Sequence, residues 1–109
     1  MPDETKWITI TQTDIDTGKR GIANSCPFSN AGHRLFPWAA YVGTTHHYIV
    51  AHERMVPTER GGYRFEGREE WYKLSNAASR AVAAYDKYLP LYPRAYSITP
   101  LNKERWKES

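Results

Sequence analysis

The single cysteine of this sequence is its first candidate for chemistry. Cys26 stands directly before Pro27, in a run that predicts the start of a helix. A thiol at a helix N-terminus can be reactive, because the helix dipole and the free amide groups stabilise the thiolate. Three interpretations are therefore open: Cys26 is a nucleophile, a metal ligand, or a small apolar side chain packed in the core.

The four histidines do not complete a catalytic or metal-binding motif with this thiol. His33 follows Cys26 by seven residues, which separates the two by about 10 Å along a helix and excludes a direct pair within it. His46 and His52 share one side of a predicted strand but lie about 20 Å apart, and His47 faces the other side. The spacing matches no zinc finger or knuckle. We therefore predict no catalytic residue, no metal and no cofactor.

Arginine and aromatic side chains are interleaved in the middle of the chain and form the second candidate. Tyrosine, tryptophan and arginine are common anchors of protein interfaces, and rings beside cations on a sheet also hold single-stranded nucleic acid. Five glutamates occupy the same stretch and would repel phosphate. We predict a binding surface formed by Trp38, Tyr41, Arg60, Tyr63, Arg64, Arg68, Trp71 and Tyr72, with Tyr92 as a further anchor.

Composition limits the class of protein that carries these residues. The 109 residues, of which 40% are hydrophobic, support one globular domain. A net charge of +3, with both signs interleaved, is compatible with nucleic acid but does not require it. One cysteine excludes an internal disulfide, which fits a reducing compartment. No secretory signal and no apolar stretch of roughly 20 residues is visible, so we expect a cytoplasmic protein without membrane contact.

Alternation and capping residues delimit the elements that must position these candidates. Residues 7–11 alternate and are rich in β-formers, which predicts a first strand. A short helix follows over residues 12–17, capped by Thr11 or Thr13 and ended by Gly18 in the usual C-terminal glycine conformation.

A second helix is predicted over residues 27–36. Asn24 or Ser25 supplies its cap, and Pro27 occupies the first turn, where a missing amide costs nothing. Pro37 stops the helix. The thiol therefore stands at the helix start.

The middle of the chain predicts an antiparallel meander. Residues 43–45 and 59–62 supply its turns, the second of which contains two glycines and is the stronger signal. The predicted strands are residues 41–42, residues 47–52, a strand ending at Val56, and residues 63–65.

One long helix and a last strand complete the domain. Ser75 caps the helix, and residues 94–98 alternate as the strand. The apolar stripe of the helix consists of Ala78, Ala81, Val82 and Tyr85. The order β-α-α-β-β-β-α-β predicts an α+β fold, a small antiparallel sheet with two or three helices packed on it. We expect a flexible N-terminus over residues 1–6, a single domain over 7–98 and a polar tail over 99–109.

Two stretches resemble small uncharacterised proteins encoded by tailed bacteriophages. Residues 8–18, followed by Ser25-Cys26-Pro27, match a strand, a Thr-Gln-x-Asp-Ile-x-x-Gly turn and a Cys-Pro helix start in that order. Residues 72–98 are similar to the C-terminal helix and last strand of those proteins, whereas 37–70 have no counterpart. The resemblance implies a phage or prophage origin and the cytoplasm of a host cell, but it implies no chemistry.

These observations favour a binding protein over an enzyme. The first hypothesis is a non-catalytic phage-type accessory protein that binds and blocks a host protein, such as a component of a defence system, through its aromatic and arginine-rich surface. The alternative is a small basic protein that binds DNA or RNA. A third hypothesis is an enzyme or metal protein that depends on Cys26. A homodimer formed through an exposed sheet edge is compatible with all three.

Overall fold

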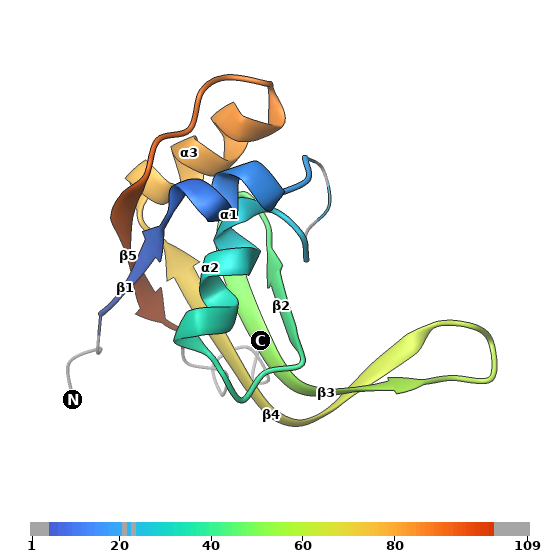
Figure 1. Cartoon of the computed structure of the whole chain (residues 1–109). Helices are drawn as coiled ribbons and strands as arrows, with labels where there is room; N and C mark the ends of the chain where they lie inside the picture. Colours follow the sequence, from blue (N-terminus) through green and yellow to red (C-terminus); the bar gives the residue numbers. More distant parts are fainter. Residues whose placement is uncertain (1–4, 21, 23, 102–109) are drawn as a thin grey trace.

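The computed structural model describes residues 5–20, 22 and 24–101 and shows a five-stranded antiparallel sheet with three helices. The elements follow the predicted order (Figure 1), and the α+β fold is confirmed. Their bounds are β1 (Lys6–Ile10), α1 (Gln12–Thr17), α2 (Pro27–Leu35), β2 (Tyr41–Thr44), β3 (Tyr48–Pro57), β4 (Tyr63–Leu74), α3 (Asn76–Asp86) and β5 (Arg94–Pro100).

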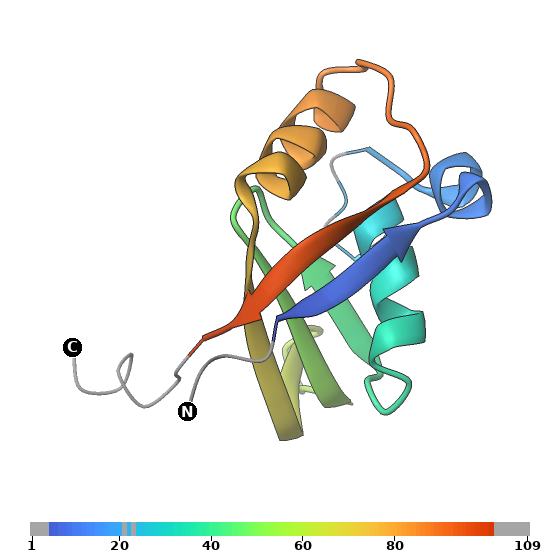
Figure 2. The ribbon, with the colours of Figure 1, turned by 90° about the vertical axis from the view of Figure 1, so that its left-hand side faces the viewer.

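The sheet has the strand order β1-β5-β4-β3-β2 and curls around α2. Although β1 and β2 are its two edges, α2 contacts both of them, which a flat sheet would not allow. Only Tyr72–Leu74 of β4 pair with β5, so the sheet turns at this short junction. In Figure 2, β1 and β5 accordingly run at an angle to the other three strands.

Every second side chain of the strands points into the space between the sheet and α2, and these side chains fill it. Buried aliphatic residues point inward from all five strands and meet Phe28, Ala31 and Phe36 from α2 and the residue after it. Gly32 allows close contact, because a Cβ there would lie 2.7 Å from Val42 Cγ1. The predicted stripe of α3 is also the face that it packs, since Ala78, Val82 and Tyr85 are buried. The inward aliphatic strand residues are Ile8, Ile10, Val42, Ile49, Ala51, Leu74 and Ile98.

The first helix begins and ends by different means. A capping box closes its N-terminus: Thr11 Oγ1 accepts the Asp14 amide at 3.2 Å, and the Asp14 carboxylate accepts the Thr11 amide at 2.8 Å. Gly18 caps the C-terminus, but its φ of −75° is extended, so the expected glycine conformation is wrong. What Gly18 provides is space, because a Cβ there would lie 2.6 Å from Pro27 Cδ.

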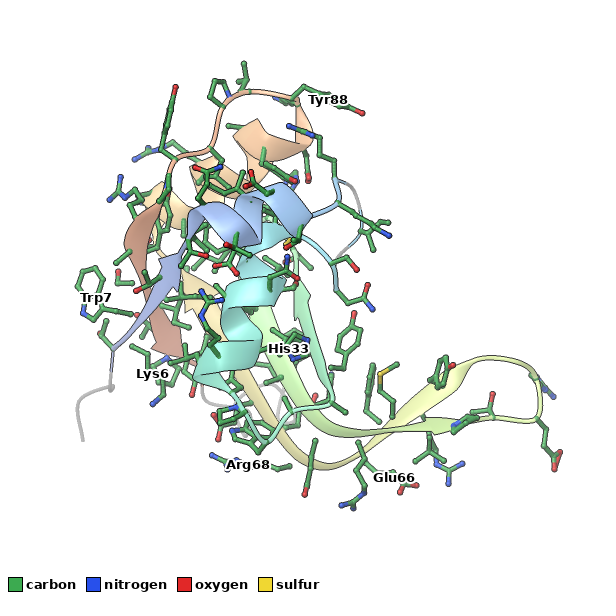
Figure 3. The ribbon with its side chains drawn as sticks, in the orientation of Figure 1. Lys6, Trp7, His33, Glu66, Arg68 and Tyr88 are labelled. Carbon is green, nitrogen blue, oxygen red and sulfur yellow. The ribbon has the colours of Figure 1, made fainter. Side chains whose placement is uncertain are left out.

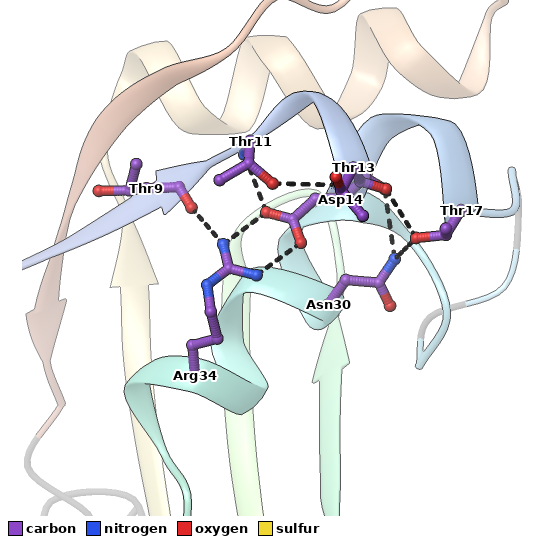
Figure 4. A network of polar contacts seen from close by, with 7 residues as sticks. All are labelled: Thr9, Thr11, Thr13, Asp14, Thr17, Asn30 and Arg34. Carbon is purple, nitrogen blue, oxygen red and sulfur yellow. Dashed lines mark hydrogen bonds and ion pairs between the residues drawn. The ribbon is translucent and has the colours of Figure 1, made fainter.

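An ionised network fastens α1 to α2 (Figure 4). Arg34 donates to both carboxylate oxygens of Asp14, at 2.7 and 2.6 Å, and to the Thr9 carbonyl at 2.9 Å. The side-chain amide of Asn30 donates to the backbone carbonyl of Asp14 at 3.2 Å. Burial alone would raise the pKa of Asp14, but the hydrogen bonds from Arg34 and Thr11 outweigh it and hold that pKa below its usual value.

The second helix is capped by a different residue from those predicted. Its N-cap is Cys26, which makes no side-chain capping bond, whereas Asn24 and Ser25 lie before it in the loop. Pro27 occupies the first turn as predicted. Gly18 lies in close contact with Pro27, so the loop brings the end of α1 against the first residue of α2.

The strands are longer than the sequence indicated. The turn between β2 and β3 lies at residues 45–47 rather than 43–45, and β3 continues without a break past Val56 to Pro57. β4 has twelve residues instead of three. The domain bounds shift accordingly: Lys6, Thr99 and Pro100 belong to strands, while the predicted ends at residues 1–4 and 102–109 lie outside the described residues.

Candidate functional site

β3 and β4 extend beyond the rest of the sheet and form a two-stranded arm. β2 pairs with β3 only as far as His52, and β5 pairs with β4 only at its far end. The paired residues 54–66, which we call the arm, therefore project from the body as a bare hairpin (Figure 1). Of the core residues that the structure describes, none belongs to the arm.

A bulge fixes the direction of the arm. The pairing of β3 with β4 shifts register between His52 and Arg54, and Gly67 opposite has a φ of +84°. The Glu53 carboxylate accepts the Arg68 amide at 2.7 Å, and a Cβ at Gly67 would collide with the same carboxylate oxygen. Bulges bend a strand and increase its twist, so these residues orient the arm relative to the sheet.

The two faces of the arm differ in polarity. Met55 pairs with Phe65 and Pro57 pairs with Tyr63, and directly opposed residues share a face. The exposed fractions are 61% for Tyr63 and 42% for Phe65. Figure 3 shows Glu66 on the opposite side of the hairpin. That second face carries Arg54, Val56, Arg64 and Glu66.

Ring stacking joins the apolar side of the arm to the outer face of the sheet. The rings of Phe65 and His52 stack with centroids 3.7 Å apart and planes 7° apart, and Tyr41 lies 5.0 Å from Phe65. His52 is consequently only 6% exposed, although it points away from the core. Strands β2, β3 and β4 thus contribute to one surface, which we call the arm face: Tyr41, His52, Met55, Pro57, Tyr63 and Phe65.

The arm and its base carry almost no net charge. Residues 53–70 contain four arginines and five glutamates, a formal charge of −1. Arg54, Arg64 and Arg68 each lie within ion-pair distance of a glutamate, at 3.5, 2.8 and 2.6 Å. Exposed pairs of this kind add little stability. They do cancel the positive charge that a phosphate backbone would require.

The structure brings some of the predicted binding residues together on or beside the arm. Arg60, Tyr63 and Arg64 are exposed arm residues, and Tyr41 belongs to the arm face. Trp71 lies further along the outer face of β4, where its indole Nε1 donates to Glu69 at 2.7 Å. Its ring meets the ring of Tyr48 edge-on, with the centroids 6.4 Å apart.

Trp38, Arg68 and Tyr72 lie on or over the opposite face of β4, and Tyr92 lies in the loop between α3 and β5. The Arg68 guanidinium stands 4.2 Å above the Trp38 ring and pairs with Glu70. Tyr72 is only 3% exposed, and its hydroxyl donates to Glu70 at 2.7 Å, so Tyr72 belongs to the core and not to a contact surface. Alternation along β4 turns it inward. Burial would raise the pKa of Glu70, but the hydrogen bonds from Tyr72 and Arg68 outweigh burial and lower it.

Met55, Pro57 and Phe65 of the arm face were not among the predicted binding residues. Tyr63 and Phe65 are two positions apart, and that spacing was the available signal. The pairing that completes the face depends on the bulge at His52, which changes the alternation of β3 from that point. Strand parity along β3 alone therefore assigns Met55 and Pro57 to the wrong face, whereas Phe65 keeps the parity of Trp71 on the outer face of β4.

The cysteine and the histidines lie apart from one another. Cys26 is 6% exposed, and its Sγ lies 3.6 Å from Ser29 Oγ, which approaches Thr44 Oγ1 at 3.0 Å. His46 and His47 lie in a turn rather than a strand, and His46 contacts Asp86 at 3.0 Å. Among the described residues, no three histidine, cysteine, aspartate or glutamate side chains are grouped to hold a metal ion.

A hollow of about 260 Å³ lies where β4 passes the end of β5. Ligand pockets have volumes of about 300–1,000 Å³ and bury most of the ligand. The hollow is below that range and does not coincide with the arm face. It is lined by Glu69, Glu70, Trp71, Tyr72, Pro100 and Leu101.

The fold and the arm define the class of this protein: a single α+β domain with an exposed hairpin arm. No family model matches the sequence, and searches of curated proteins and of solved structures return no match. The resemblance to phage proteins therefore stays a prediction. None of the described helices has the length and apolar character needed to cross a membrane.

Proposed function

We propose that this protein is a non-catalytic binding protein that holds a partner protein on its arm face and blocks the surface that it covers. The main support for this proposal is that Tyr63 and Phe65, which are 61% and 42% exposed, lie on a hairpin that contributes no residue to the described core. Contiguous exposed apolar side chains mark interaction sites, and tyrosine is enriched among residues that dominate binding energy.

The charge pattern favours an apolar partner surface with a polar rim. Arg54 and Arg64 are paired with neighbouring glutamates, so the rings of Tyr41, Tyr63 and Phe65 form an uncharged centre. This is the usual anatomy of a protein interface. The predicted phage origin makes a protein of the bacterial host, such as a defence component, the partner that we propose.

Nucleic acid is the weaker proposal for the same surface. Binding to phosphate releases counterions only where cations are free to replace them, and three of the four arginines are paired. Cys26 does not support a thiol mechanism, because it is 6% exposed.

Capture with matched variants tests the proposal. The arm variant combines Tyr63→Ser with Phe65→Ser, and the control is Trp7→Ser, which removes a ring 63% exposed on β1. Figure 3 shows Trp7 on the far side of the body from the arm. We expect wild type and control to capture the same host protein, and the arm variant to lose it. Circular dichroism melting curves check that all three fold.

Site-specific cross-linking and salt dependence complete this test. A photoreactive phenylalanine at position 63 should cross-link to the captured protein, whereas one at position 7 should not. Retention of the partner by the arm variant would refute the proposal. If the protein instead binds DNA or RNA, with an affinity that falls steeply as salt rises and that Arg60→Ala reduces, then the surface is a nucleic-acid site.

A further inference from the structure

The loop between α3 and β5 presents a proline-rich segment that the arm does not involve. Residues 89–94 read Leu-Pro-Leu-Tyr-Pro-Arg, and the first five lie outside helices and strands. Proline fixes its own φ near −65°, and the residue before a proline is restricted to extended conformations. Both Leu89 and Tyr92 precede a proline. The segment is therefore biased towards the polyproline II conformation, which has three residues per turn.

Exposure follows this three-residue period. Leu89 and Tyr92 are 52% and 70% exposed, and Pro90 and Pro93 are exposed as well. Leu91, on the third ridge, is half-buried and packs against the core. One ridge thus anchors the segment, while two ridges present the pairs Leu89-Pro90 and Tyr92-Pro93 to solvent.

The end of α3 holds the segment in place. Tyr88 has a φ of +65°, and the amides of Tyr88 and Leu89 donate to the carbonyls of Tyr85 and Ala84 at 3.0 and 2.9 Å, which is a Schellman motif. Arg20 lies over the rings of Tyr85 and Tyr88, 4.5 and 4.6 Å from their centroids. The start of the segment at Leu89 is therefore held before a partner binds, and preorganisation favours affinity.

Charge completes the pattern. Residues 87–94 contain Lys87 and Arg94 and no acidic residue. The Arg94 guanidinium lies 4.6 Å from the centre of the Tyr96 ring. Among the residues that the structure describes, no carboxylate pairs with Arg94. A partner of complementary chemistry carries an acidic side chain beside the site for Pro93.

We propose that residues 89–94 are a docking segment for a second protein, one with a groove lined by aromatic side chains and flanked by a carboxylate. Such grooves receive preformed polyproline II segments, as those of SH3 domains do. The pairs Leu89-Pro90 and Tyr92-Pro93 fill adjacent pockets of the groove, and Arg94 meets the carboxylate. Figure 3 places Tyr88 at the far end of the body from Glu66 on the arm, so both surfaces can be occupied together.

The test measures binding of the full chain to a panel of purified SH3 domains by isothermal titration calorimetry. We expect at least one domain to bind and a proline-rich peptide ligand of that domain to displace the chain. Pro90→Ala combined with Pro93→Ala should weaken binding at least tenfold, and Arg94→Glu should do the same. Circular dichroism melting curves confirm that the variants remain folded.

Two controls make the outcome specific. Pro57→Ala changes an exposed arm proline and should leave binding unchanged, as should the combined Tyr63→Ser and Phe65→Ser variant. The proposal is overturned if no domain of the panel binds, if the peptide does not compete, or if the double proline variant binds as wild type does. Equal loss in the Pro57→Ala control also overturns it.

Discussion

At the scale of single residues, Asp14 shows how one carboxylate serves two structures. It closes the capping box of α1 and accepts two bonds from Arg34 on α2. Both roles require the ionised form, which is why the pKa of Asp14 is lowered despite burial. The residue links helix initiation to the packing of the first two helices.

The pH dependence of stability follows from that pKa. A lowered native pKa contributes stability above the unfolded value of 3.8, and this contribution is lost as the pH falls through the native value. Asp14→Asn should cost about 2 kcal/mol at pH 7, as loss of hydrogen bonds to a charged group does. Urea denaturation at pH 7, 5 and 3 should show a smaller acid loss in the variant. Equal acid losses in both proteins would contradict the assignment.

At Tyr88 the backbone conformation lowers the stability of the fold, whereas the side chain raises it. A left-handed conformation costs a residue other than glycine about 1 kcal/mol, while Arg20 stacks on its ring. Cation–π contacts at exposed sites contribute about 0.5–1 kcal/mol. In an Arg20→Ala background, Tyr88→Gly should therefore raise the free energy of unfolding more than it does in wild type. Guanidinium denaturation of the four proteins of this cycle gives the difference, and purely additive effects would rule out the compensation.

At the scale of elements, two glycines with positive φ offer a matched comparison at the hairpin. Gly61 in the turn has open space around its missing side chain, whereas a Cβ at Gly67 would collide with Glu53. Gly67→Ala should cost about 1 kcal/mol more than Gly61→Ala, because both variants share the strain of a positive φ but only Gly67→Ala displaces the Glu53 carboxylate that accepts the Arg68 amide. Amide hydrogen exchange at Arg68 should accelerate only in the Gly67 variant. Similar exchange in both variants would show that Glu53 does not hold the base of the arm.

Local signals were sufficient for the order of elements but not for their lengths. Thr11 and Ser75 cap helices by bonds between neighbours, which the sequence displays directly. β4 was cut short because residues 66–70 are mostly charged and the arm is solvated on both faces, so no alternation marks a strand there. The cap of α2 was missed because Cys26 makes no side-chain capping bond, so no residue type marked it in the sequence.

The candidate site divides in the same way. Tyr63 and Arg64 follow a recognisable turn and were predicted. Met55 and Pro57 were missed because the register shift at His52 changes the alternation of β3, and Tyr72 was placed at the surface although it faces the core. Residue type indicated which side chains suit a binding surface. The face of the sheet on which each side chain lies depended on pairing between strands that are distant in the sequence.

At the scale of the whole molecule, the arm and the body are energetically separable. The described core draws on all five strands and on the helices but on no residue of the arm. Replacing residues 56–64 by Asn-Gly, a turn that suits a two-residue hairpin loop, should therefore leave a cooperative domain. We expect the thermal midpoint to change by less than about 8 °C, the effect of roughly 1 kcal/mol in a domain of this size. Calorimetry measures it, and loss of a cooperative transition would show that the arm supports the core.

Separation of the arm from the core also has an evolutionary consequence. Substitutions at residues 56–64 leave the described core unchanged, and changes in the core leave those residues as they were. Selection for a new partner and selection for stability thus act on different residues. The same body can carry a succession of recognition sequences, and a library randomised only on the arm face would yield new specificities from one scaffold.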